Sequence, residues 1–331
     1  MGRVTMDGTM ENNRNASLDR RRIWFFLIFA YGIAWITGLI IYLTGGLSNS
    51  PVLAPNLTLA AVLLATSYMW APALAHVITR LVTHEGWANA SLRPYFRLGW
   101  GYWIIAWILP AVVTILGAIL FFLLFPQFYD AQLNTVRANF MNAGQPVPEN
   151  LWGFIGLQLL LAVLISPIVN GLFTFGEEFG WRGYLLPKLM PLGARKAMLA
   201  QGLIWGVWHW PVIAMGYEYG FDYPGFPWVG MLLFLLFTFS AGVILAWVTL
   251  RGRSVWPAVI GHGAINGIAA VSALFIRGQP PTLLGPLPVG ITGMAFYLLV
   301  ALVLFFLPSR LQPAYPNSLP LPGKEEEIQP A

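Results

Sequence analysis

Long apolar runs, each about 20 residues, alternate with short polar segments along most of the chain. A run of that length is what an α-helix needs to cross the hydrocarbon core of a bilayer. The pattern predicts eight spans, at residues 23–43, 57–78, 102–125, 154–186, 197–215, 228–250, 255–275 and 289–307. Pro110 predicts a kink in the third span, and Pro167 predicts an interruption of the fourth. The predicted fold is an all-α polytopic membrane protein.

The polar segments divide the chain into three parts. We expect a polar cytoplasmic leader at 1–22, a single transmembrane domain at 23–308, and a Pro-rich polar cytoplasmic tail at 309–331. Residues 126–150 are polar and contain Pro146 and Pro148, which predicts a loop with a short surface helix. The first apolar run is too long for a signal-peptide core and lacks a small-residue cleavage site, so we expect it to be a retained anchor.

The charges predict how the spans are oriented. Only 9% of the 331 residues are charged, whereas 57% are hydrophobic. If the amino terminus is cytoplasmic, 16 of the 18 Lys and Arg residues fall on the cytoplasmic side, and only Arg137 and Arg277 fall outside. This bias follows the positive-inside rule and predicts that both termini are cytoplasmic, in the cell membrane. The net charge of +5 therefore needs no nucleic-acid partner, and membrane lipids are the expected surroundings.

The chain contains no cysteine, which excludes disulfides, thiolate metal sites and a cysteine nucleophile. Candidate chemistry instead begins at Glu177 and Glu178, at the end of an apolar segment. Carboxylates at membrane depth are costly and usually mark function. Glu178 and Arg182 are four residues apart with the acid first, the favoured order for an ion pair on a helix. Glu177 lies about 100° round the helix, so we expect it to be free to act as a general base.

Two of the four histidines lie inside apolar spans. On a helix, Trp205 shares a face with His209, and His262 shares a face with Asn266. Counted at the helical rise of about 1.5 Å per residue, Glu177, His209 and His262 lie at compatible depths in the membrane. We therefore expect them to line one cavity that is open to the cytoplasm, among spans 4, 5 and 7. By contrast, we expect His76 to lie at the membrane interface or in solvent, and we expect His84 to be solvated in a charged loop.

Glu177-Glu178-x-x-x-Arg182, Trp205-x-x-x-His209 and His262-x-x-x-Asn266 together resemble the three motifs of the CAAX prenyl protease and bacteriocin-processing enzymes. These intramembrane endopeptidases include type II CAAX endopeptidases and lysostaphin-resistance-like proteins. The resemblance covers residues 154–276, the expected protease core. Trp205 departs from the usual Phe of the second motif, a change expected to alter packing rather than chemistry.

The resemblance implies a role for each motif residue. Glu177 and His209 would activate a water, and His262 and Asn266 would form an oxyanion site. Glu178 and Arg182, with Trp205, would support the base or hold the substrate, a peptide or a lipidated protein. We favour catalysis without a cofactor, but Glu177, His209 and His262 could also form the three-ligand set of a catalytic zinc or similar divalent metal, with Glu178 as base.

Two other classes of protein remain open. The same buried polar residues could form the gate of a small transporter, or belong to a non-catalytic membrane protein that binds a partner, such as an immunity protein. The sequence shows no inverted repeat of the kind that many transporters have. The motif positions also keep their reactive side chains, which favours the protease.

Overall fold

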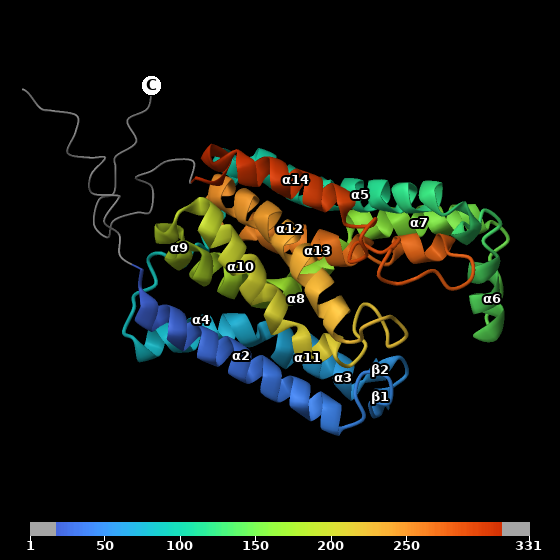
Figure 1. Ribbon diagram of the computed structural model, residues 1–331, viewed down its shortest axis with the longest axis horizontal. Coiled ribbons are helices and arrows are strands. Elements are labelled where there is room, and N and C mark those ends of the chain that lie inside the picture. The colour runs from blue at the N-terminus through green and yellow to red at the C-terminus, as the bar shows by residue number, and fades with distance from the viewer. Residues whose placement is uncertain (1–17, 313–331) are drawn as a thin grey trace, which may run out of the picture.

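The computed structural model describes residues 18–312, so positions 1–17 of the expected leader and 313–331 of the expected tail lie outside the described residues. The described chain is a bundle of helices with one small antiparallel hairpin (Figure 1). The hairpin pairs β1, Val52–Ala54, with β2, Leu57–Thr58. The all-α fold is thus confirmed apart from this hairpin.

The α-helices are, in chain order, α2 Arg20–Leu43, α3 Leu59–Leu63, α4 Met69–Val82, α5 Phe96–Leu124, α6 Asn134–Asn142, α7 Leu151–Leu164, α8 Ser166–Gly180, α9 Leu186–Leu189, α10 Ala194–Trp208, α11 Trp210–Ile213, α12 Trp228–Gly252, α13 Trp256–Ile268 and α14 Ala295–Phe306. Short 3₁₀ segments lie at Pro126–Phe128, Met190–Leu192, Val271–Phe275 and Pro308–Leu311. Two wider, π-helical segments lie at Leu64–Tyr68 and Trp181–Leu185.

Five helical stretches among residues 18–312 are long and apolar enough to cross a membrane, and α7 with α8 makes a sixth if this bent pair is one span. The five are Arg20–Leu43, Leu59–Val82, Phe96–Leu124, Trp228–Gly252 and Trp256–Phe275. The pair is bent by 44° next to Pro167, as the sequence predicted. The predicted surface helix of the 126–150 segment is also present, as α6.

Two of the eight expected spans form shorter helices than predicted. The fifth is divided at His209 into α10 and α11, because Pro211 has no N–H to continue the helical ladder. In the eighth, the regular helix begins only at Ala295. The preceding residues form turns in which the backbones of Gly285 and Gly290 pack directly against each other.

Helix α8 lies between α4 and α13, and glycines permit this close packing. A side-chain carbon at Gly176 would lie 2.6 Å from the Met69 carbonyl oxygen, and one at Gly180 would lie 2.5 Å from that of Pro72. Gly176 and Gly180 are four residues apart, the small-residue spacing that lets membrane helices approach closely. On its other side, Thr174 of α8 donates a hydrogen bond to a carbonyl of α13. The two acidic residues therefore lie on the buried end of α8, where it packs closely against α4.

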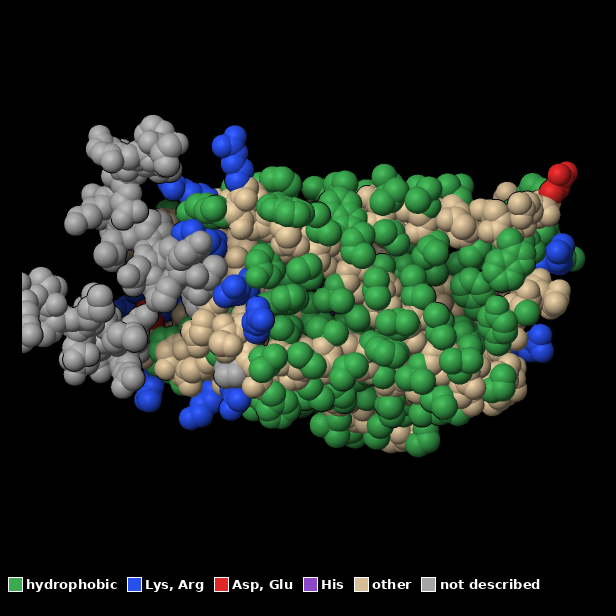
Figure 2. All heavy atoms as spheres, turned by 90° about the horizontal axis from the view of Figure 1, so that it is seen from above, with side chains coloured by type: hydrophobic (Ala, Val, Ile, Leu, Met, Phe, Trp, Pro, Cys, Tyr) green, Lys and Arg blue, Asp and Glu red, His purple; other side chains and the backbone are tan. Residues whose placement is uncertain are grey.

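Lys and Arg side chains gather near one end of the molecule, and a broad apolar surface covers the middle (Figure 2). Two of the arginines counted on the cytoplasmic side are buried in helical segments rather than exposed to solvent. Arg80 is 2% exposed in α4, and Arg182 is fully buried just after α8. Both are engaged by hydrogen bonds inside the protein, which explains why they do not extend into solvent.

Candidate active site

The predicted ion pair between Glu178 and Arg182 is present and completely buried. Arg182 Nη1 donates to Glu178 Oε1 over 2.8 Å, and neither side chain is exposed. The same carboxylate oxygen lies 2.8 Å from His262 Nδ1, on α13. Glu178 therefore joins α8 to α13 through one oxygen that two nitrogen atoms share.

Glu177 is buried and points to α10. The indole Nε1–H of Trp205 donates to Glu177 Oε2 over 2.8 Å. The guanidinium carbon of Arg182 lies 4.4 Å from the centre of the same indole ring, a cation–π contact. Trp205 therefore does more than fill space, because its N–H binds the candidate base directly, and whether it also affects chemistry stays a prediction. Glu177 is also less free than the sequence suggested.

His209 reaches the cluster through Trp205 rather than through Glu177. Its Nδ1 lies 2.9 Å from the Trp205 carbonyl oxygen. Because a carbonyl only accepts, Nδ1 carries the hydrogen, so in a neutral ring Nε2 has the free lone pair. The ring centres of His209 and His262 lie 5.9 Å and 5.3 Å from that of Trp205. Trp205 is thus the common neighbour of Glu177, Arg182 and both histidines.

The break in the helix at His209 is stabilised from outside α10. The Trp208 carbonyl oxygen accepts a 2.7 Å hydrogen bond from the Tyr68 hydroxyl and another from the Trp35 indole. A carbonyl left without an intrahelical partner in a membrane must find a donor elsewhere. Side chains from α2 and from the first π-helical segment supply these donors and hold His209 in place.

Asn266 is the one motif residue that lies apart from this cluster. It follows His262 by one turn of α13, is exposed, and makes no side-chain hydrogen bond within the described part of the chain. A cavity of about 220 Å³ begins beside it at Gly267 and runs between α7, the start of α8 and the end of α13. Asn266 is accordingly available to a bound molecule. It is not held by the acidic cluster, by which we mean Glu177, Glu178, Arg182, Trp205, His209 and His262.

The described residues do not offer the ligand set of a metal ion. Among residues 18–312, no group of three or more His, Cys, Asp or Glu side chains is arranged to hold one. The three candidate zinc ligands point to other partners: Glu177 to Trp205, His262 to Glu178, and His209 to a backbone carbonyl. The two histidine contacts occupy Nδ1 and leave Nε2 open, as in histidines that bind a metal, so these contacts alone do not decide against the metal alternative, which chelation tests.

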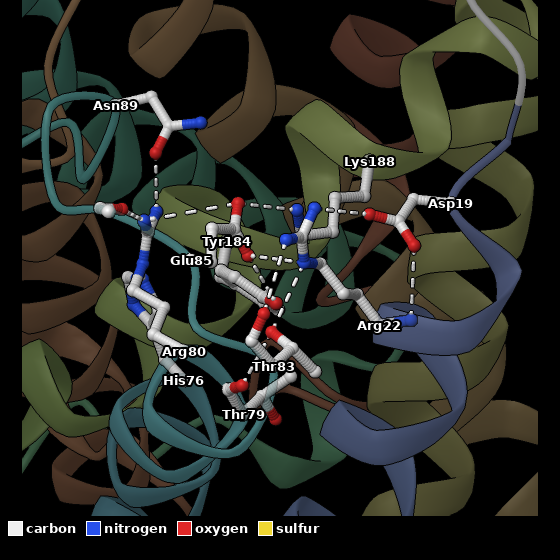
Figure 3. A network of polar contacts seen from close by, with 11 residues as sticks. Asp19, Arg22, His76, Thr79, Arg80, Thr83, Glu85, Asn89, Tyr184 and Lys188 are labelled. Atoms are coloured by element: carbon white, nitrogen blue, oxygen red, sulfur yellow. Dashed lines mark hydrogen bonds and ion pairs between the residues drawn. The ribbon is translucent and has the colours of Figure 1, made fainter.

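A second polar cluster lies where α2 begins, and we call it the Glu85 network (Figure 3). Glu85 accepts hydrogen bonds of 2.9 Å from Tyr184 and from Lys188, and Arg22 lies 3.3 Å away. Burial by itself would raise the pKa of Glu85, but the hydrogen bonds and charges of Lys188, Tyr184 and Arg80 outweigh it and hold the pKa below its ordinary value. The network ties α2, the loop after α4, and α9 together.

The expectation for His76 is wrong. It is fully buried, with its ring packed 4.2 Å from that of Phe179 and 4.5 Å from that of Tyr184. A buried Arg80 one turn away supplies its polar partner, so the side chain needs no solvent. His84, as expected, is exposed.

Sequence reasoning also missed Gln201, a buried residue of α10 that hydrogen-bonds the backbone after α8. A lone polar residue within an apolar run was the available signal for both Gln201 and His76.

Residues 152–268 match the model of the type II CAAX prenyl endopeptidase Rce1-like family. The matched stretch runs from the start of α7 to the end of α13 and includes every member of the acidic cluster. This segment therefore carries an Rce1-like domain of the type II CAAX prenyl endopeptidase family, and the resemblance is confirmed for it.

Curated relatives match shorter pieces. CAAX prenyl protease 2 from Methanococcus maripaludis is 36% identical over 93 residues, which cover 27% of this chain and 34% of that protein. The chain thus spans about a third of that relative's length. Two fluoride-specific ion channels, both named FluC, are also similar. The one from Xanthomonas euvesicatoria is 39% identical over 69 residues, covering 18% of this chain and 52% of that protein. The one from Xanthomonas axonopodis is 36% identical over 93 residues, covering 26% of this chain and 65% of that protein.

Proposed function

We propose that this protein is an intramembrane endopeptidase that hydrolyses a peptide bond near the cytoplasmic face of the membrane. The observation that carries the proposal is the buried cluster of Glu177, Glu178, Arg182, Trp205, His209 and His262, which joins α8, α10 and α13 within the Rce1-like domain. Family membership of that domain implies a peptidase. The cluster supplies a base and hydrogen-bond donors, the two things that peptide hydrolysis requires.

Glu177 is the proposed general base, assisted by His209. The carboxylate takes a proton from a water molecule, and Nε2 of His209 accepts a hydrogen bond from the same water. The resulting hydroxide adds to the scissile carbonyl, and the carbonyl oxygen becomes an oxyanion. Glu177 then passes the proton to the departing amine, so that the carboxylate is restored and two peptide fragments leave.

His262 and Asn266 are the proposed donors to the oxyanion. Because Nδ1 of His262 faces Glu178, only Nε2 remains for the substrate, and a doubly protonated ring would donate from it. The Glu178 carboxylate would balance that charge and fix the orientation of the ring. The amide of Asn266, exposed one turn away, would complete the oxyanion site when substrate binds. Arg182 holds Glu178 in turn.

We further propose eight membrane-spanning segments with both termini cytoplasmic, in the cell membrane. The five or six long helices are supplemented by α10 with α11, and by α14, all of which pack along α12. The gathering of Lys and Arg at one end supports this orientation (Figure 2). The substrate in this setting is a peptide or a lipidated protein that reaches the cluster from the membrane.

The test is hydrolysis of a fluorogenic peptide with a carboxy-terminal CAAX sequence by the full chain in nanodiscs. Glu177→Gln keeps the shape of the side chain but removes the proton acceptor, so turnover should fall by about 10²–10⁴ while substrate still binds. Glu149→Gln, at an exposed carboxylate, is the matched control and should behave as wild type. Equal turnover by wild type and Glu177→Gln would rule out the proposed base.

Chelation separates this mechanism from the zinc alternative. Activity should survive exhaustive treatment with phenanthroline, because the described residues offer no ligand set and no step needs a metal. Loss of activity that zinc restores would instead make Glu177 a ligand.

The two FluC relatives favour an ion channel as the second candidate function. Fluoride efflux from liposomes that contain the purified chain would support it, particularly if Glu177→Gln left both efflux and the peptide assay unchanged.

A further inference from the structure

The helix that carries both glutamates becomes wider immediately after them. Residues Trp181–Leu185 form a π-helical turn between α8 and α9. Pro187 explains its location, because a regular α-helix would place the proline ring against the carbonyl of Gly183 and would need an N–H that proline lacks. π-Helical turns often occur at functional sites. Side chains of two other helices donate hydrogen bonds to the backbone where this turn begins.

His76 provides the first support, from α4. Arg80 Nε donates to His76 Nε2 over 2.5 Å, which makes Nε2 an acceptor and leaves the ring hydrogen on Nδ1. Nδ1 lies 2.9 Å from the Phe179 carbonyl oxygen and therefore donates to it. Arg80 is itself fixed by the Gly86 carbonyl and by Asn89, within the network of Figure 3. The hydrogen bond to Phe179 is thus rigidly directed.

Gln201 provides the second support, from α10. Its Nε2 donates over 2.9 Å to the Trp181 carbonyl oxygen, and the side chain is 1% exposed. Phe179 and Trp181 are the residues after Glu178 and before Arg182. The two side-chain donors therefore hold the backbone on either side of Gly180, between the two members of the buried ion pair.

We propose that His76 and Gln201 are positioning residues, which clamp the π-helical turn so that Glu177 meets Trp205 and Glu178 meets His262. The proposal rests on the endopeptidase function given above. Neither residue touches the reacting atoms. A small rotation of this turn would separate Glu178 Oε1 from His262 Nδ1, which are 2.8 Å apart, and would turn Glu177 away from Trp205. The clamp acts on the rate through the placement of these two carboxylates.

Two polar variants of His76 test the clamp. Asn places its amide nitrogen where Nδ1 was and can still donate to the Phe179 carbonyl, whereas Gln moves the donor one bond farther along. His76→Gln should therefore lower kcat roughly 10- to 100-fold, the effect of one lost buried hydrogen bond, with KM unchanged. His76→Asn should recover most of the rate. Gln201→Met should reproduce the His76→Gln loss from the other side of the turn.

Hydrogen exchange gives a readout that does not depend on activity. Peptides that cover residues 177–187 should exchange faster in His76→Gln and Gln201→Met than in wild type and His76→Asn, while peptides from α12 and α14 stay unchanged. Uniformly faster exchange with no difference between Gln and Asn would mean a merely structural role and would overturn the proposal. So would full activity of His76→Gln.

The two readouts also separate this inference from the proposed function. If wild type does not cleave the peptide, the endopeptidase function fails, and the local change in exchange still tests the clamp. If wild type cleaves and the variants differ in neither rate nor exchange, only the clamp fails.

Discussion

Removing Glu178 or Arg182 alone should destabilise the protein strongly, and removing both should cost less than the sum of the two single changes. Both side chains are fully buried, with Nη1 and Oε1 2.8 Å apart. Deleting one partner leaves the other as an uncompensated buried charge, which typically costs about 3–5 kcal/mol. Glu178→Gln with Arg182→Gln removes both charges of the pair together, so neither partner is left without the other. The double variant should therefore be more stable than the sum of the two single changes predicts, by about 1–3 kcal/mol.

The contacts also predict an asymmetry between the two single variants. Within residues 18–312, Nε and Nη2 of Arg182 have no hydrogen-bond partner, so Glu178 provides its only one. Glu178 retains His262 when Arg182 is removed. Glu178→Gln should therefore cost more stability than Arg182→Gln.

The assay measures the free energy of unfolding of each purified variant, by reversible unfolding in mixed detergent micelles. Glu177→Gln with Arg182→Gln is the matched control, because Glu177 makes its hydrogen bond to Trp205 instead, and its coupling should be clearly weaker. Additivity of Glu178→Gln and Arg182→Gln to within about 0.5 kcal/mol would refute the reasoning.

Three further predictions concern other parts of the molecule. Trp205→Phe removes the indole N–H from Glu177 but keeps an aromatic ring, so kcat/KM should fall by about 10- to 100-fold, and an unchanged value would return Trp205 to a packing role. The pKa of Glu85 lies below its ordinary value of 4.5, so the stability it contributes is complete above that value and is lost as the pH falls through the lower, folded-state pKa. Thermal unfolding at a series of pH values should show this acid loss in wild type and a flatter profile in Glu85→Gln, and parallel profiles would contradict it. Reporter fusions after Asn142 and after Tyr219 should both lie outside the cell, and a cytoplasmic signal from either would reject the eight-span topology.

The local geometry of α8 followed from the sequence because it depends on neighbours along one helix. Glu178 and Arg182 pair at the spacing of four residues, and the helix breaks beside Pro167. The apolar runs likewise predicted the membrane helices, since burial of the backbone in lipid leaves few other structures. The breaks at His209 and before Ala295 were missed because the apolar pattern continues through them, although Pro211 signalled the first.

Contacts between helices were decided only by the tertiary structure. Sequence spacing placed His262 near Asn266, but packing of α13 on α8 aimed its ring at Glu178 and left Asn266 exposed. Helix packing also brought the Trp205 N–H to Glu177 and the His76 ring to the carbonyl of Phe179, each within hydrogen-bond distance. Helical periodicity specifies which residues share a face of one helix. Which donor on another helix meets that face depends on how closely the glycines let the backbones approach, and this only the packed bundle determines.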